Sequence, residues 1–94
     1  MSLVFRIIHS EVCRKIIKVL ANQDTFISLS EIKRLGNLKY YPSTEITLLK
    51  AGNLIEVIVK DRRQYCKLTD KGKKLAKIIE ELDKIDSSGE MYED

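Results

Sequence analysis

The chain has 94 residues, of which 44% are hydrophobic and 33% are charged, and its formal net charge is +3 at pH 7. This length predicts a single domain with a modest core, and the longest apolar runs are far too short to span a bilayer. The start lacks the pattern of a secretory signal, and the two cysteines form neither a metal-ligand spacing nor a disulfide framework. We therefore expect a cytoplasmic protein without a cofactor, in which Cys13 and Cys66 are core residues.

The charges are unevenly distributed along the chain. All 17 Lys and Arg lie in residues 1–85, where they outweigh the acids by seven, whereas residues 86–94 hold four acids and no base. The positive net charge of residues 1–85 predicts a polyanionic partner, although a net charge of this size alone is common in proteins that bind no nucleic acid. The last nine residues, DSSGEMYED, are interpreted as an acidic flexible tail that follows a folded domain over residues 1–85.

The first part of the chain predicts a scaffold helix. Ser10 is a suitable N-cap for a helix from Glu11 to about Ala21, whose apolar stripe includes Cys13 and Leu20. Residues 3–8, LVFRII, are apolar enough for burial and either extend this helix backwards or pack on a partner subunit. Residues 25–27 are a candidate short strand.

The next segment has the pattern of two helices joined by a turn. The S-x-x-E spacing of Ser28 and Glu31 predicts a capping box and a helix from about Leu29, which Gly36-Asn37 ends. Ile32 and Leu35 are expected to face inward. A second helix is predicted over residues 42–51, with Pro42 in its first position, Ile46 and Leu49 on its inner face and Gly52 as its stop.

Two short runs then predict a hairpin. IEVIVK (55–60) and QYCKL (64–68) alternate in polarity and are joined by Asp61-Arg62-Arg63. Thr69 is expected to cap a last helix over residues 70–85, whose seam contains Leu75, Ile78, Leu82 and Ile85. A helix with a polar outer face beside a hairpin with a basic tip is a shape that can straddle DNA.

This order of elements resembles the winged helix-turn-helix DNA-binding proteins of the PadR-like, MarR-like and HxlR-like kind, in their small archaeal type. The matching pieces are Leu29-Ser30-Glu31-Ile32, then Leu48 to Ile55 around Ala51-Gly52, and Leu68-Thr69-Asp70-Lys71-Gly72, which is similar to the "LT-x-KG" segment of the family. The resemblance covers residues 10–80 and implies an α+β, mostly helical fold with residues 42–51 as recognition helix and residues 55–68 as wing. Asn53 looks like an insertion in the usual Gly-Leu-Ile.

The resemblance and the polar pattern together name the candidate contacts with double-stranded DNA. They are Lys39, Tyr40, Tyr41, Ser43, Thr44, Thr47, Lys50, Arg62, Arg63 and Gln64. Each has an alternative, because hydroxyls on a helix and arginines at a hairpin tip also serve to keep a surface solvated. Of Tyr40 and Tyr41, one is expected to reach a phosphate and the other to fill the core.

The apolar seam of the last helix is either core or a homodimer interface. We favour the interface, formed by Val4, Phe5, Ile8, Leu75, Ile78, Leu82 and Ile85, because so small a domain leaves part of the seam uncovered. The sequence shows no motif for catalysis, for a metal or for a small-molecule ligand. The expected function is a sequence-specific, nucleoid-associated transcriptional regulator. The alternatives are a centromere-binding or DNA-coating adaptor of a partition system, and a protein-interaction module.

Overall fold

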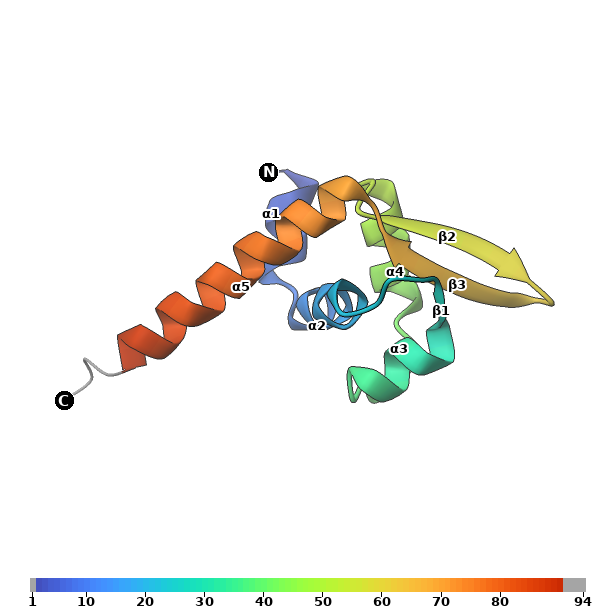
Figure 1. The fold of residues 1–94 in the computed structure, drawn as a ribbon, viewed down its shortest axis with the longest axis horizontal. Helices are drawn as coiled ribbons and strands as arrows, with labels where there is room; N and C mark the ends of the chain where they lie inside the picture. Colours follow the sequence, from blue (N-terminus) through green and yellow to red (C-terminus); the bar gives the residue numbers. More distant parts are fainter. Residues whose placement is uncertain (1, 91–94) are drawn as a thin grey trace.

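The computed structural model describes residues 2–90, and the side chains of residues 2–86, as five helices and a three-stranded sheet. The elements in chain order are α1 Leu3–His9, α2 Glu11–Ala21, β1 Ile27–Ser28, α3 Leu29–Leu35, α4 Ser43–Ala51, β2 Ile55–Lys60, β3 Arg63–Leu68 and α5 Asp70–Glu90. Figure 1 shows the β2–β3 hairpin and α5 projecting from opposite ends of the helical body.

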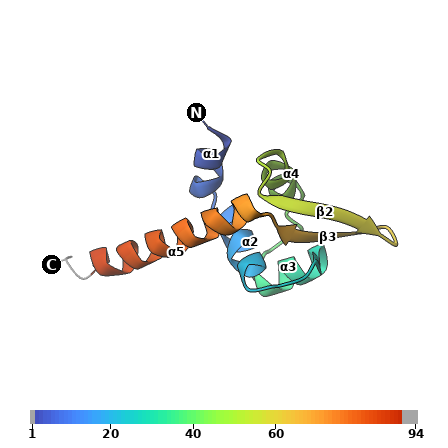
Figure 2. The same ribbon diagram turned by 45° about the horizontal axis from the view of Figure 1, so that its top comes forward.

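Helix α2 is the centre of the core. It packs against α1, α3, α4, α5 and β3, and it buries Cys13, Ile16, Ile17 and Leu20. Figure 2 shows it lying between α5 and α3, beside the base of the hairpin. Burial raises the pKa of the Cys66 thiol to about 11 and also raises that of Cys13. Both cysteines are therefore neutral core side chains, as the sequence predicts.

Ser10 divides the N-terminal region into two helices. Its backbone is extended, and its side-chain oxygen accepts a hydrogen bond from the Cys13 N–H at 3.2 Å, so α2 begins at Glu11 as predicted. The preceding segment forms α1 rather than a continuation of α2, and it places Ile7 in the core of its own chain.

Helices α3 and α4 end in the same way. Leu38 N–H donates to Lys33 O at 2.9 Å, and Leu54 N–H donates to Leu49 O at 3.0 Å, which is the long bond of a Schellman cap. The left-handed residue in each cap is the asparagine, with φ of 54° at Asn37 and 62° at Asn53, whereas the preceding glycines, Gly36 and Gly52, have negative φ. Gly52 is thus the C-cap of α4, as predicted, and Asn53 follows it as the left-handed residue that completes the cap.

The sheet has the order β1-β3-β2 and is antiparallel throughout. Ile27 lies opposite Cys66, and the β2–β3 register runs without a bulge from Ile55↔Leu68 to Lys60↔Arg63. The hairpin turn consists of two residues, Asp61 and Arg62, so Arg63 belongs to the strand, whereas the sequence placed it in the turn. The predicted strand at residues 25–27 is shifted and shorter, because its pairing with β3 covers only Ile27 and Ser28.

Helix α5 is longer than predicted and extends to Glu90. Residues 86–90, which we assigned to a flexible tail, are thus helical, and residues 91–94 lie outside the described part of the chain. The seam of this helix is divided between two environments. Leu75 is only 4% exposed and belongs to the core of its own chain, which corrects its assignment to the homodimer interface, whereas Ile78, Leu82 and Ile85 are exposed.

The first turn of α5 is attached to the end of α4 by hydrogen bonds. The Thr69 hydroxyl donates to Asn53 O at 2.7 Å and accepts from the Gly72 N–H at 3.0 Å, which makes Thr69 the N-cap of α5 as predicted. Thr69 N–H donates to Leu54 O at 3.0 Å, and Lys71 Nζ donates to Gly52 O at 2.9 Å. The three carbonyls that follow α4, from Gly52 to Leu54, thus receive hydrogen bonds from Thr69 and Lys71.

The close contact between α5 and Leu54 leads to the first prediction. A Cβ on Gly72 would lie 2.1 Å from Leu54 O, so Gly72→Ala forces the two backbones apart. We expect the free energy of unfolding to fall by about 1–3 kcal/mol in urea denaturation. Lys74→Ala, at an exposed position two residues further along α5, is the control and should change it by less than about 0.5 kcal/mol.

Candidate nucleic-acid interface

The candidate interface is built on α4, whose two faces differ as the sequence predicts. Ile46 and Leu49 are buried, while Ser43, Thr44, Thr47 and Lys50 are exposed. Pro42 is fully buried and is the N-cap of α4 rather than its first residue, so it anchors the start of the helix in the core. The polar face of α4 is consequently held outward from both ends, by Pro42 at one end and by the α5 contact at the other.

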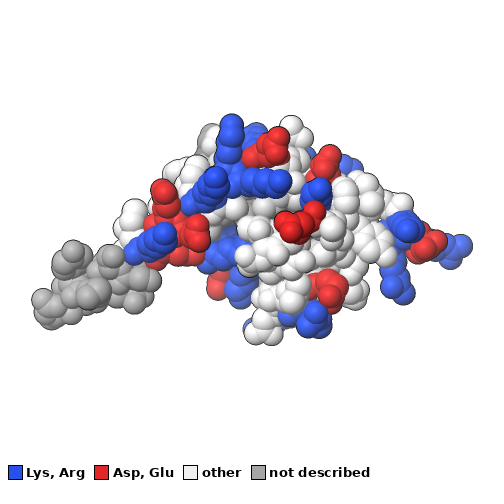
Figure 3. Space-filling model, viewed as in Figure 1, with Lys and Arg blue, Asp and Glu red and all other residues white. Residues whose placement is uncertain are grey.

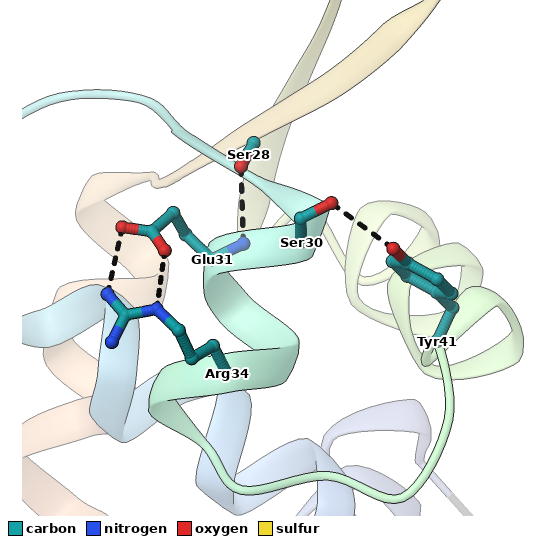
Figure 4. A network of polar contacts seen from close by, with 5 residues as sticks. All are labelled: Ser28, Ser30, Glu31, Arg34 and Tyr41. Carbon is teal, nitrogen blue, oxygen red and sulfur yellow. Dashed lines mark hydrogen bonds and ion pairs between the residues drawn. The ribbon is translucent and has the colours of Figure 1, made fainter.

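Helix α3 precedes α4 in the chain and packs against α2, β1 and β3. Ser28 caps α3 by accepting from the Glu31 N–H at 3.2 Å, which is half of the predicted capping box. The Glu31 carboxylate pairs instead with Arg34, at 2.8 Å from Nε, and this hydrogen bond lowers the pKa of Glu31 (Figure 4). Ile32 is buried as expected, but Leu35 is 44% exposed, which contradicts its assignment to the inner face. This seven-residue helix thus contributes a single fully buried side chain, that of Ile32, to the core.

Tyr41 links α3 to the start of α4. Its hydroxyl lies 3.2 Å from Ser30 Oγ (Figure 4). The Lys33 ammonium lies 5.8 Å from the centre of its ring. Tyr40 and Tyr41 are 66% and 54% exposed, so neither fills the core, and the expectation that one of them would do so is wrong. Leu38 and Pro42 pack inward in this connection instead, which leaves both phenols available to a partner.

The tip of the wing has an unusual backbone for its residues. Asp61 and Arg62 both have positive φ, at 52° and 65°, as a two-residue type I′ turn requires. Asn-Gly is the usual pair in such a turn, because a residue with a Cβ is strained in the left-handed region. The turn projects Arg62 and Arg63 into solvent, and Figure 3 shows Lys and Arg side chains at this end of the molecule beside an acidic one.

A shallow groove lies between the wing and α3, and polar groups line most of it. Its lining residues are Ser28, Leu29, Ser30, Tyr41, Arg62, Arg63 and Gln64. Three hydroxyls, two guanidinium groups and an amide therefore meet where the tip of the hairpin approaches the start of α3. Four of these residues are among the DNA contacts that the sequence predicts, whereas the sequence analysis did not place Ser28 and Ser30 in a groove, because it interpreted their segment only as a helix cap. The repeated serine in Ser28-Leu29-Ser30 is the signal that was available.

The remaining predicted residues lie as follows. Lys39 and Gln64 are exposed, the first in the connection before α4 and the second on β3. Among the expected dimer residues, Val4 and Ile8 are partly buried against the core, while Phe5 is half-exposed. The Phe5 and His9 rings meet edge to face, with 4.8 Å between their centroids. Within residues 2–86, whose side chains the structure describes, no group of His, Cys, Asp or Glu side chains is placed to hold a metal ion. No helix of that range has the length and apolar character to cross a membrane.

The order of elements, the α3–α4 pair and the β2–β3 hairpin define a winged helix-turn-helix fold, as the resemblance implies. Sso10a-2, a DNA-binding protein from Sulfolobus solfataricus, has this fold with a TM-score of 0.69 and 17% identity, over 92% of this chain and 99% of its own. AF1382 from Archaeoglobus fulgidus is similar with a TM-score of 0.68 and 18% identity, over 96% of this chain and 98% of its own.

A third similar structure is NadR in complex with 4-hydroxyphenylacetate, with a TM-score of 0.69 and 21% identity over 97% of this chain and 68% of NadR. No family model and no curated sequence matches the chain. At these identities the three structures establish the fold alone.

The strained turn of the wing gives the second prediction. Arg62→Gly should raise the free energy of unfolding by about 1 kcal/mol, because glycine adopts the positive φ without a Cβ clash. Arg63→Gly is the matched control, since it removes the same charge from a strand position and should lower stability. Thermal unfolding of both variants measures the difference, and equal shifts in the two would contradict a strained turn.

Proposed function

We propose that this protein binds double-stranded DNA as a homodimeric transcriptional regulator of the cytoplasm. The observation that carries the proposal is the polar groove in which Tyr41, just before α4, meets the wing tip and the first residues of α3. A helix with a protruding polar face fits the major groove, and a basic hairpin beside it fits the adjacent backbone. Sso10a-2, described as a DNA-binding protein, shares this fold over nearly its whole length, which supports the proposal.

The polar groove beside the wing suits a phosphate of the DNA backbone. Hydroxyls and guanidinium groups are the usual donors to phosphate oxygens, and the groove combines Ser30 and Tyr41 with Arg62 and Arg63. Because Ser30 and Tyr41 are already hydrogen-bonded to each other, their positions are fixed before any ligand arrives. In this proposal the groove sets the orientation of the protein on the duplex and carries no sequence information.

The sequence preference would come from α4. Ser43, Thr44 and Thr47 present short hydroxyls, and Lys50 presents a cation one turn further on. The Thr47 hydroxyl donates its proton to Ser43 O at 3.1 Å, so its oxygen is left as an acceptor. An acceptor at this position is suited to the amino groups of adenine or cytosine, which are donors in the major groove.

The salt dependence of binding tests the proposed DNA contact. Replacing Arg62 and Arg63 together by alanine should weaken binding to any duplex, and the slope of log K against log salt should fall by about 0.9 for each phosphate that the protein no longer neutralises. The control is the double variant Lys15→Ala with Lys84→Ala, which removes the same charge from α2 and α5 and should leave the slope nearly unchanged. An identical slope in wild type and wing variant would rule out phosphate contacts at the wing tip.

The dimer in this proposal forms through α5. Ile78, Leu82 and Ile85 are 50%, 38% and 64% exposed and recur at the spacing of one helical face. A single winged helix reads too short a stretch for selective binding in a genome, so two copies are needed. Pairing two α5 helices would bury this face and set two recognition helices about 34 Å apart, one turn of DNA.

Leu82→Lys tests the dimer. A lysine in the exposed face of α5 should give folded monomers, because Leu82 is not part of the core. Glu80→Lys places the same cation about 200° away around the helix and should leave the dimer intact. Sedimentation at micromolar concentration measures both variants, and a monomeric wild type that binds DNA tightly would contradict the dimer.

A further inference from the structure

The outer edge of the wing has features of a pairing surface. Strand β2 lies at one edge of the sheet, and within residues 2–90 no strand pairs with its other side. Four of its six residues are β-branched, and its register with β3 contains no bulge. Ile58 is 43% exposed, and Val59, at 68%, is the most exposed large hydrophobic side chain of the described residues. Such an edge lacks the proline or bulge that usually protects edge strands from pairing.

The sequence of β2 is complementary to itself. Glu56-Val57-Ile58-Val59-Lys60 has an acid and a base at equal distances from Ile58, with a valine on each side between them. An antiparallel copy centred on Ile58 therefore places Glu56 opposite Lys60 twice, and Val57 opposite Val59 twice. Residues opposite each other in a sheet share a face, so opposite charges and apolar side chains match on both faces.

The backbone also permits this register. The pair that closes a two-residue turn, here Lys60↔Arg63, is hydrogen-bonded, and bonded and non-bonded pairs alternate along an antiparallel ladder. The N–H and C=O groups of Glu56, Ile58 and Lys60 consequently point to β3, while those of Val57 and Val59 point to the free edge. A copy centred on Ile58 bonds Val57 to Val59 of the other chain in both directions, which uses the edge groups that are free.

The charges at the wing tip favour the same partner. Lys60 lies opposite Arg63 within the hairpin, and two like charges in direct opposition destabilise a strand pair. Glu56 of a second copy would lie next to Lys60 from the other side and offset this repulsion.

We infer that the edge of β2 is a contact site for β2 of a second copy of this chain, in antiparallel register centred on Ile58. The contact is separate from α5 and needs no DNA. One strand pair buries little surface, so the contact is weak between free molecules and is populated where wings are concentrated. With dimers also joined through α5, it would link them into larger assemblies, and the angle between the two two-fold axes decides whether these close or extend as a chain.

Disulfide trapping tests the register directly. In an antiparallel pair centred on residue 58, two cysteines at this position lie about 4.5 Å apart between Cα atoms, which suits a disulfide. Ile58→Cys should therefore cross-link to a dimer under mild oxidation at about 1 mM protein. Val59→Cys is the control, because its more exposed side chain faces Val57 of the other copy and should not cross-link. Cys13 and Cys66 are buried and do not compete.

Charge exchange provides the second measurement, in the Ile58→Cys background. Glu56→Lys and Lys60→Glu should each reduce the cross-linked dimer about tenfold, because each sets like charges opposite one another twice. A mixture of these two variants restores opposite charges and should recover the dimer as a cross-linked pair of the two chains. Equal cross-linking at residues 58 and 59, no cross-linking, or no recovery in the mixture would overturn the inference. If the protein passes these tests but binds no DNA, the β2 contact is supported and only the proposed function is wrong.

Discussion

The attachment of α5 to the end of α4 is the contact on which the arrangement of this protein depends. The Thr69 hydroxyl and backbone, with the Lys71 ammonium, bind three successive carbonyls from Gly52 to Leu54. Those carbonyls follow α4 and lead directly into the first strand of the wing. One short segment therefore fixes the end of α4, the base of the hairpin and the direction of α5. Only glycine fits at residue 72, because its backbone touches Leu54 O.

This contact also explains why two separated sequence pieces together identified the fold. Ala51-Gly52-Asn53-Leu54 and Leu68-Thr69-Asp70-Lys71-Gly72 are far apart in the chain, but they bind each other in the structure. Helix starts at Ser10, Ser28 and Thr69 were predictable, because a cap is a local hydrogen bond between residues three apart. The inner face of α4 was predictable for a similar reason, since its periodicity lies in nine consecutive residues.

The features that the sequence did not reveal depend on packing between distant residues. Leu35 and Tyr41 are apolar or aromatic and were therefore expected, at least in part, to turn inward, but the core around α2 is already filled by Ile32, Leu38 and Pro42. The turn was predicted as Asp61-Arg62-Arg63, one residue too long, because Arg62 is not a residue type that favours a positive φ and only the two-residue register imposes it. Leu75 and Ile78 are three residues apart on one helix, and only the position of α2 decides which of them is buried. The roles of α4 and of the wing in binding stay predictions.

The length of α5 has a mechanical consequence. Its first turn is fixed at Thr69 and Gly72, while its 21 residues extend about 30 Å along the helix axis, well past the helical body. A small rotation of a straight helix about its first turn displaces its far end by a larger distance. For α5, a tilt of about 10° moves the C-terminal end by about 5 Å. The Lys18–Asp83 ion pair, at 2.5 Å, connects the middle of this rod to α2 and restrains that tilt. The position of the C-terminal end of α5 therefore depends on the attachment of its first turn to the end of α4 and on its packing against α2.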